Sequence, residues 1–551
     1  MTMGSRWRAF GLFACLVVPI VAPAAEPAFA FAATAADDDA QVASAVARLS
    51  TEALAAGETG TATIPAASLA HLRIAAGQAA PAEAAVLAVM RELDTAGDAA
   101  RARRWVPYLL RARAMRKAVG PRFDGAYTQA FRDHFHALDD LPALQTAFWF
   151  TADPERAQQD LRGMLAKALE DRQVSLAEAF DLARGQAFVD TYRDAMRLAA
   201  PLVREDEVRR YRIDEDVLIR TPQGVTLSAL VALPRAAKAP LPAAMLFTIY
   251  ADTVDNRASA LQSAARGYAG VVVDARGKRL SPDAIAPYEH EVDDASAAVE
   301  WIAAQPWSDG RVAMHGGSYS GFAAWAAAKR MPAALKTLVV HVAAIPGLGV
   351  PMENNVFLNA NYAWPFYVGN HRLPDNALYF QRERWDALAE KWYASGRPYR
   401  DIDQVDGLPN PWLQRWLSHP SYDAYWQAMV PQGAEYARID IPVLSITGYY
   451  DDGQVSALHY FREHHRHNPA ARHALLIGPY DHFGAQAASK PRVLRDYAID
   501  PVAQFDTVDL TYQWIDHVLR GAPRPELVRD TVNYQVMGAN EWRHAPSLEA
   551  A

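Results

Sequence analysis

The segment that most constrains this chain is a glycine-flanked serine, Ser318, between an apolar run and a strong helix former. The run Arg311–Met314 predicts a short buried strand, and the alanine-rich stretch Phe322–Lys329 predicts a helix. Gly316 and Gly321 lack a Cβ, so the turn can be tight and the helix can start close to the strand. A serine at such a turn has the geometry of a nucleophile elbow, in which the hydroxyl projects beyond the sheet.

The same letters also allow a simpler interpretation. The usual elbow pattern is Gly-x-Ser-x-Gly, whereas here the second glycine comes one position late, at Gly321. A Gly- and Ser-rich loop in which Ser318 caps an ordinary helix would look similar. The motif alone leaves a nucleophile and a helix cap equally open, and the rest of the chain must decide.

Residues 1–36 predict a signal peptide followed by a linker. Two arginines precede the apolar run Ala9–Ala22, which is too short for a comfortable membrane span. Small-x-small cleavage sites follow at Ala22–Ala24 and at Ala28–Ala30. We therefore expect an exported protein, either periplasmic or extracellular.

The single cysteine, Cys15, lies inside this signal. The apolar run continues beyond it through Val21, which argues against lipoprotein anchoring at Cys15. The mature chain would have no cysteine, which excludes disulfides, a thiol nucleophile and a zinc–thiolate site. A formal net charge of −8 without a basic block gives no indication of nucleic acid, and no later apolar run is long enough to span a membrane.

The remaining residues fall into segments of different character. Residues 37–205 are rich in Ala, Arg and Leu with helical periodicity, which predicts a helical N-terminal domain. In residues 206–345, short apolar runs alternate with helical stretches, and the pattern resumes in residues 439–530. This alternation predicts the two parts of one α/β core, a doubly wound and mostly parallel sheet.

Residues 346–438 interrupt the strand pattern and are dense in aromatic side chains, among them Trp364, Tyr425 and Trp426. An insertion here would lie above the carboxyl ends of the strands, where ligands bind in open α/β sheets. We therefore predict a helical, aromatic-rich cap whose side chains line a substrate pocket. The alternative, that the aromatics only hold the cap together, applies to most of them.

A serine hydroxyl needs a base to take its proton, and the base needs a group that orients it. Downstream of Ser318, two predicted strands end in loops that carry these residue types: Asp451 and Asp452 after the first, His482 after the second. The chain order Ser, Asp, His is that of an α/β-hydrolase. We assign Ser318 as nucleophile, Asp451 as acid and His482 as base, with Asp452 as the alternative acid.

Several segments resemble the cocaine esterase / X-prolyl dipeptidyl peptidase family, whose relatives include α-amino-acid ester hydrolases and glutaryl or cephalosporin acylases. The resemblance covers about residues 210–545 and rests on the elbow Gly316-x-Ser318-Tyr319-x-Gly321, Asp274–Gly277, Glu291-x-x-Asp294, Glu300–Ser308, His419–Trp426, Gly448–Asp451 and Gly478–His482. It implies an α/β-hydrolase fold and a serine hydrolase that needs neither cofactor nor metal.

The resemblance also implies an oxyanion hole made by the hydroxyl of Tyr250 and the backbone N–H of Tyr319. Two donors aimed at a developing alkoxide are what acyl transfer requires. If the substrate carries a cationic amine, a carboxylate in the pocket is needed, and Glu353 is the best-placed candidate. The alternative is that Glu353 is a solvated loop residue.

Residues 531–551 depart from the family pattern. Members usually carry a large C-terminal jelly-roll domain, and Val532–Gly538 resembles only its opening strand. We therefore expect a truncated jelly-roll start, whose lone apolar strand would be an exposed edge. The role of residues 37–205 is left open.

Together these features predict an exported serine hydrolase that cleaves ester or amide bonds through an acyl-enzyme, similar to X-prolyl dipeptidyl peptidases and acylases. Its substrate would be a small ester or amide, or a short peptide. One alternative is a carboxylesterase with an aromatic pocket and no peptidase activity. Another is a binding protein on an inactive hydrolase scaffold. The oligomeric state is not indicated.

Overall fold

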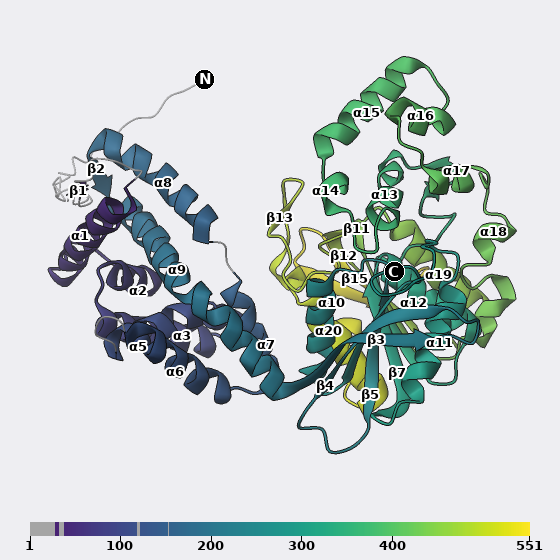
Figure 1. The fold of residues 1–551 in the computed structure, drawn as a ribbon, viewed down its shortest axis with the longest axis horizontal. Helices are drawn as coiled ribbons and strands as arrows, with labels where there is room; N and C mark the ends of the chain where they lie inside the picture. The colour runs from purple at the N-terminus through teal and green to yellow at the C-terminus, as the bar shows by residue number, and fades with distance from the viewer. Residues whose placement is uncertain (1–27, 32–37, 118–121, 152–153) are drawn as a thin grey trace, which may run out of the picture. The chain divides into compact units, whose positions relative to one another are not determined.

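The computed structural model describes residues 28–31, 38–117, 122–151 and 154–551. The chain divides into two compact units, Met1–Arg204 and Glu205–Ala551 (Figure 1). Within the described ranges, every helix is too short or too polar to cross a bilayer. Residues 1–27, which include Cys15, most of the predicted signal and its predicted cleavage site at Ala22–Ala24, lie outside the described residues.

The first unit is helical. Its helices are α1 (Asp39–Glu58), α2 (Ala66–Ala75), α3 (Ala79–Thr95), α4 (Ala99–Arg103), α5 (Val106–Lys117), α6 (Phe123–His136), α7 (Asp140–Ala147), α8 (Pro154–Asp171) and α9 (Leu176–Arg210), which leads into the second unit. The side chain of Asp38 caps α1 by accepting hydrogen bonds from two backbone N–H groups. Strand β1 (Ala28–Ala30) pairs antiparallel with β2 (Gln173–Ser175) and buries Phe29 in the helical core.

The second unit contains a ten-stranded sheet with the order β16-β15-β12-β11-β8-β7-β5-β6-β4-β3. Its strands are β3 (Tyr211–Arg220), β4 (Thr226–Pro234), β5 (Leu241–Thr248), β6 (Ala269–Asp274), β7 (Ser308–Gly317), β8 (Leu335–His341), β11 (Val443–Tyr450), β12 (His473–Asp481), β15 (Val532–Val536) and β16 (Glu541–Ala545). The seven central strands run parallel, and only β3, β4 and β16 are antiparallel to their neighbours. The predicted doubly wound, mostly parallel sheet is confirmed.

Helices cover both faces of this sheet, and the alternation of side chains along β5 shows how. Met245 and Phe247 face a core shared with α11 (Glu291–Ala303) and α12 (Tyr319–Arg330). Ala244 points the other way, into a core shared with α20 (Thr507–Arg520). Helix α10 (Thr253–Ala264) packs against β4 and β6, and α19 (Gln454–His467) against β11 and β12.

The cap lies between β8 and β11. It contains the short strands β9 (Met352–Glu353) and β10 (Val356–Phe357) and the helices α13 (Trp364–Gly369), α14 (Asn376–Tyr379), α15 (Arg382–Ser395), α16 (Ile402–Asp406), α17 (Pro411–Leu417) and α18 (Ala424–Gln427). These helices gather beyond one end of the sheet (Figure 1). The buried ammonium of Lys278 ties the cap to the core, because it donates hydrogen bonds to the carbonyls of Val368 and His371, both at 2.8 Å.

The C-terminal strands differ from the expected jelly-roll start at residues 531–551. Strand β15 pairs parallel with β12, and β16 pairs antiparallel with β15, so both strands extend the hydrolase sheet. Side chains add to this pairing: Asn533 donates to the carbonyl of Leu475, and Tyr449 donates to the carbonyl of Gln535. The apolar strand is therefore not a lone edge, since the sheet supplies partners for its backbone groups.

Candidate active site

Ser318 occupies the turn between β7 and α12, where its backbone adopts φ 56° and ψ −120°. A positive φ is strained for a residue with a side chain, and such strain is concentrated at functional sites. The turn is held by a hydrogen bond from Ser318 N–H to the carbonyl of His341 and by one from Ala344 N–H to the carbonyl of Ser318. The Ser318 hydroxyl makes no capping hydrogen bond to α12. It is therefore not the side-chain cap that the simpler interpretation requires.

The late second glycine has a steric reason. A Cβ on Gly321 would lie 2.8 Å from the Cβ of Ala343 and 3.2 Å from the carbonyl oxygen of Gly316. A Cβ on Gly316 would lie 2.6 Å from the Cβ of Ser320. Helix α12 can approach β7 and the segment after β8 only because both positions lack a side chain.

His482 follows β12, and its Nδ1 atom lies 2.9 Å from Oδ1 of Asp451. Asp451 is fully buried, where it accepts hydrogen bonds from the Thr447 hydroxyl and from the backbone N–H of Gly453. Asp452 lies farther from the same nitrogen, at 3.3 Å, and its side chain is 80% exposed. The geometry favours Asp451 as the group that orients His482, because its carboxylate is itself held in place.

The three candidate residues follow strands whose carboxyl ends share one edge of the sheet. The strands are in register there: Gly317 pairs with His341, His341 with Ile446, and Ile446 with Leu476. No hydrogen bond joins Ser318 to His482 among the described residues, and such bonds are often loose in unliganded enzymes. Gln486 connects the two sides, since its Nε2 donates to the carbonyl of His482 and its Oε1 fills the space where a Gly317 side chain would be.

The electrostatics around His482 favour its protonated form. Burial opposes the positive charge, but the hydrogen bonds and negative charges of Asp451 and Asp452 outweigh it and raise the pKa of His482 to about 9. A base must be neutral to accept a proton. The imidazole therefore becomes available as a base only in mildly alkaline solution, unless a ligand changes its surroundings.

Tyr250 lies directly after β5, in a tight turn where its N–H donates to the Thr248 hydroxyl. Its own hydroxyl accepts a 3.2 Å hydrogen bond from the indole Nε1 of Trp364 and interacts with Ser318. Tyr319 is the first residue of α12, so no intrahelical carbonyl can accept its backbone N–H. Both predicted oxyanion donors are therefore next to Ser318, Tyr250 through its side chain and Tyr319 along the chain.

Residues 223–484 match the X-Pro dipeptidyl-peptidase family, S15. The match covers 262 of the 551 residues, a little under half of the chain. It is 26% identical over 350 residues to the cocaine esterase of Rhodococcus sp. (strain MB1 Bresler), covering 60% of this chain and 59% of that protein. This chain therefore spans less than two thirds of the length of that relative.

Two solved structures are also similar. The first is an α-amino acid ester hydrolase (20% identity, TM-score 0.49), with 61% of this chain and 59% of that chain covered. The second is an aminopeptidase from a marine sediment archaeon, Thaumarchaeota (19% identity, TM-score 0.48), with 61% and 58% covered.

The two acidic residues of the segment Glu291-x-x-Asp294 are buried. Glu291 accepts a hydrogen bond from the hydroxyl of Tyr319, and that hydroxyl accepts one from the backbone N–H of Tyr288. Burial raises the pKa of Glu291 to about 7, although the Tyr319 hydroxyl acts in the opposite direction. Asp294 forms a two-bond ion pair with Arg276. Glu291 therefore fixes the residue that follows the nucleophile, a contact that the motif alone did not reveal.

The three aromatic residues predicted to bind substrate differ in whether they contact the candidate active site. Trp364 reaches Tyr250, whereas Tyr425 stacks on His419 and donates its hydroxyl to Glu289. Trp426 is fully buried, and its indole N–H donates to the carbonyl of His419. Its ring packs in the hydrophobic core that contains the central strands and α12, and its role in substrate binding stays a prediction.

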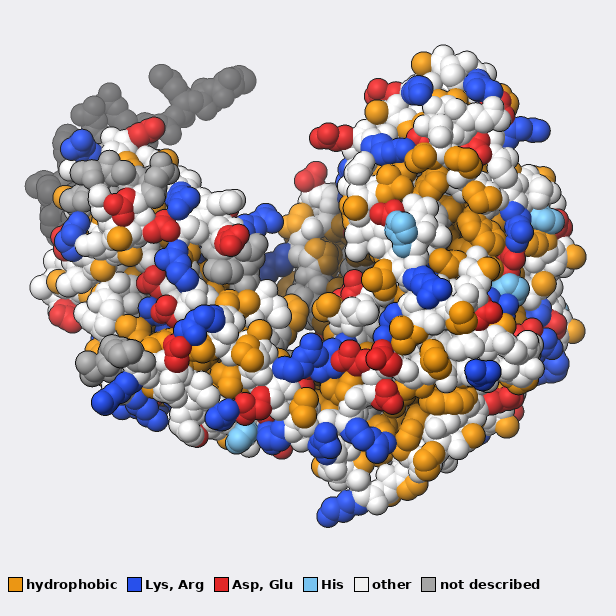
Figure 2. Space-filling model, in the orientation of Figure 1, with side chains coloured by type: hydrophobic (Ala, Val, Ile, Leu, Met, Phe, Trp, Pro, Cys, Tyr) orange, Lys and Arg blue, Asp and Glu red, His pale blue; other side chains and the backbone are white. Residues whose placement is uncertain are grey.

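Glu353 lies in β9, part of a two-residue ribbon with β10, and is partly exposed. Among the described residues, no hydrogen bond or ion pair connects it to Ser318, Tyr250 or His482. Aromatic rings surround the candidate oxyanion donor instead: Tyr367 and Tyr319 lie 5.8 and 6.2 Å from the ring of Tyr250. On the face shown in Figure 2, hydrophobic side chains gather over the cap.

Asp451, Asp452 and His482 are also a set of described residues whose ligand atoms lie within 4.8 Å of one another, close enough to hold a metal ion. The hydrogen bonds of Asp451 to Thr447 and Gly453 occupy its oxygens, which suits a triad acid better than a metal ligand.

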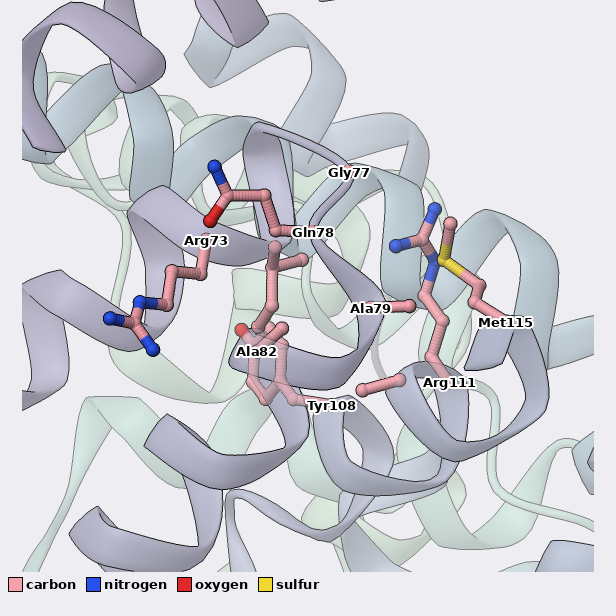
Figure 3. Close-up of a pocket in the computed structure, with 10 residues that line it drawn as sticks. Arg73, Gly77, Gln78, Ala79, Ala82, Tyr108, Arg111 and Met115 are labelled. Carbon is pink, nitrogen blue, oxygen red and sulfur yellow. The ribbon is translucent and has the colours of Figure 1, made fainter. Parts of the chain in front are cut away.

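Cavities also occur away from the sheet edge that carries Ser318, Asp451 and His482. In the helical unit, residues of α2, α3 and α5 such as Arg73, Ala82 and Tyr108 enclose a cavity of about 10 Å³ (Figure 3). That volume holds one water molecule at most. Two larger hollows of about 430 and 440 Å³ border Trp307 at the amino ends of β5 and β7, opposite Ser318.

Proposed function

We propose that this chain is an exported serine hydrolase that cleaves ester or amide bonds through an acyl-enzyme. The observation that carries the proposal is the oriented pair of His482 and Asp451 at the same sheet edge as the strained Ser318 turn. The match of residues 223–484 to the X-Pro dipeptidyl-peptidase family, S15, and the likeness to a cocaine esterase support this chemistry.

In the proposed reaction, Ser318 Oγ attacks the substrate carbonyl carbon while His482 Nε2 takes the hydroxyl proton. The oxyanion that forms accepts hydrogen bonds from Tyr319 N–H and Tyr250 O–H. The bond to the leaving group then breaks, and the leaving group takes the proton from His482. A water molecule attacks the acyl-enzyme by the same route and releases the acid and free Ser318.

Asp451 has a supporting role in both halves of this cycle. Its hydrogen bond to Nδ1 fixes the tautomer in which Nε2 carries the lone pair that accepts the Ser318 proton. Its charge also stabilises the imidazolium that forms.

The aromatic surroundings of Tyr250 favour a second, narrower candidate, a carboxylesterase without peptidase activity. A peptidase that holds a free N-terminal amine needs a carboxylate in the pocket, and Glu353 has no contact with the site among the described residues. Turnover of Gly-Pro- and Ala-anilides should be compared with turnover of phenyl esters. Turnover of esters alone would select the carboxylesterase, and turnover of the anilides would select the peptidase.

The nucleophile is tested by labelling with a fluorophosphonate and measuring intact mass. We expect one adduct on the natural sequence and none on Ser318→Ala. A protein that takes no label and hydrolyses no phenyl ester at any pH would refute the proposed activity. That result would favour the binding protein on an inactive scaffold.

We also propose that residues 1–24 direct export. Fractionation of a producing cell should place the protein outside the cytoplasm. Retention in the cytoplasm at full length would refute the export proposal without affecting the proposed chemistry.

A further inference from the structure

A cap residue makes a direct hydrogen bond to the side chain proposed to stabilise the oxyanion. Nε1 of Trp364, the first residue of α13, lies 3.2 Å from the hydroxyl oxygen of Tyr250. Trp364 is nearly buried, and its ring stacks on Tyr288 with 5.2 Å between centroids. The indole is therefore held in one orientation, with its N–H directed at Tyr250.

The direction of this hydrogen bond follows from the chemistry of the two side chains. An indole nitrogen can only donate, so the Tyr250 oxygen must be the acceptor. A phenol carries one proton, and that proton is then free to be donated elsewhere. The hydroxyl also interacts with Ser318. The oxyanion would form beside Ser318, on the carbonyl oxygen of the substrate that it attacks.

The donated N–H also changes how readily Tyr250 gives up its proton. Burial raises the pKa of Tyr250 to about 12, and its hydrogen bonds with the side chains of Trp364 and Ser318 act in the opposite direction. A hydroxyl that accepts a hydrogen bond becomes a better donor, because chains of hydrogen bonds polarise one another. Trp364 therefore strengthens the donor that faces the reacting oxygen.

The C-terminal end of α13 and the residues that follow it are hydrogen-bonded to the core of the hydrolase unit. Lys278 binds the carbonyls of Val368 and His371, and the backbone N–H of Arg279 donates to the carbonyl of Arg372. These bonds fix the end of α13 while Trp364 fixes its beginning. These hydrogen bonds therefore fix α13, and with it Trp364, relative to Tyr250.

From this geometry we propose that Trp364 is a positioning residue of the oxyanion hole, which aims and polarises the Tyr250 hydroxyl through its indole N–H. The proposal rests on the proposed serine hydrolase function, and it replaces the expectation that Trp364 only lines the substrate pocket. A pocket wall would act on substrate binding, whereas a positioning residue acts on the transition state through Tyr250.

The test is a double-mutant cycle on kcat and KM with p-nitrophenyl acetate, using Trp364→Phe, Tyr250→Phe and the double variant. Losing one oxyanion donor typically lowers kcat by about 10²–10³-fold, which we expect for Tyr250→Phe. A neutral hydrogen bond is worth about 0.5–1.5 kcal/mol, so Trp364→Phe should lower kcat by about two- to tenfold with little change in KM. In the Tyr250→Phe background, Trp364→Phe should have no further effect on kcat.

Two controls separate the N–H from the bulk of the ring. Replacement of Trp364 by 3-benzothienylalanine keeps the ring volume and removes only the N–H, and it should reproduce the loss in kcat even if Trp364→Phe folds poorly. Trp416→Phe changes a tryptophan whose centroid is 6.1 Å from that of Trp364 and which has no hydrogen bond to Tyr250. It should show no coupling to Tyr250→Phe.

Three results would overturn the inference: a full kcat in the benzothienyl variant, an equal loss from Trp364→Phe in the natural and Tyr250→Phe backgrounds, or a change confined to KM. Each assumes a natural sequence that hydrolyses the ester. A natural sequence with no hydrolysis and no fluorophosphonate label would refute the proposed function instead. The two failures are therefore distinguishable.

Discussion

Nδ1 of His482 lies 2.9 Å from the buried carboxylate of Asp451 and 3.3 Å from the exposed carboxylate of Asp452. The two acids differ mainly in how firmly they are held. Asp451 is fixed by Thr447 and Gly453, while the side chain of Asp452 is largely exposed. This difference makes the roles of the two acids separable by experiment.

Asp451→Asn should lower kcat by about 10⁴-fold, because an amide at this position favours the wrong imidazole tautomer. Asp452→Asn is the matched control and should retain most of the activity at alkaline pH. Steady-state kinetics on a phenyl ester measure both. If Asp452→Asn shows the larger loss, the triad acid is Asp452.

The activity of the natural sequence should rise with pH until His482 loses its proton. The pKa of His482 is raised to about 9, so the imidazole is protonated and inactive as a base at neutral pH. The acidic limb of the kcat/KM profile should therefore have its midpoint near pH 9. A midpoint near the ordinary histidine value of about 6.5 would contradict this assignment.

Asp452→Asn should move that midpoint to lower pH. The Asp452 charge stabilises the imidazolium, so its removal lowers the pKa of His482 and increases activity at neutral pH. Added salt should shift the natural profile in the same direction, because an exposed charge is screened. An unchanged profile in Asp452→Asn would show that Asp452 has no electrostatic effect on the base.

Lys278→Met should loosen the cap. The substitution leaves the carbonyls of Val368 and His371 without their buried donor, at a cost of about 1–3 kcal/mol for each unsatisfied group. Thermal unfolding and proteolysis within residues 346–438 measure the effect. Lys336→Met is the control, because that partly exposed lysine donates to the nearby carbonyl of Ala333 and not to the cap, and its effect should be within about 0.5 kcal/mol. Equal stability of the two variants would contradict a clamping role for Lys278.

Signal processing should occur after Ala24 rather than after Ala30. Cleavage after Ala30 would remove β1, and with it Phe29, which packs in the core of the helical unit beside Val174. Burial of a phenylalanine contributes about 1.5–3 kcal/mol, so a chain that starts at Phe31 should unfold at a lower temperature. N-terminal sequencing of the exported protein identifies the site. A mature protein that begins at residue 31 would contradict the prediction.

Much of the sheet, and the loops that carry the candidate site residues, could be predicted because the signals are local. The apolar runs before Ser318 and before His482 are strands in the structure, and the loops that follow them lie at one edge of the sheet. Apolar strand runs and turn glycines are each recognised from a few neighbouring residues, and the order of the catalytic residue types is given directly by the sequence. The nucleophile elbow and the two loops with Asp451 and His482 belong to this class.

Other relationships were not predictable, because they depend on residues far apart in the chain. Tyr250 and Trp364 are 114 positions apart, so no local sequence pattern could predict their hydrogen bond. The burial of Trp426 depends on its packing in a core that also contains the central strands and α12, which aromatic content alone cannot indicate. The parallel pairing of β15 with β12 likewise places the expected jelly-roll strand in the hydrolase sheet.

The sequence by itself determined the residue types at the strand ends, their order, and the strained turn that presents Ser318. The tertiary structure decided which buried carboxylate contacts His482, which cap ring contacts Tyr250, and which cap aromatics are fully buried. The physical reason is distance: periodicity and turn chemistry act over a few neighbouring residues, whereas a hydrogen bond between two loops exists only after the sheet register and the cap have brought them together.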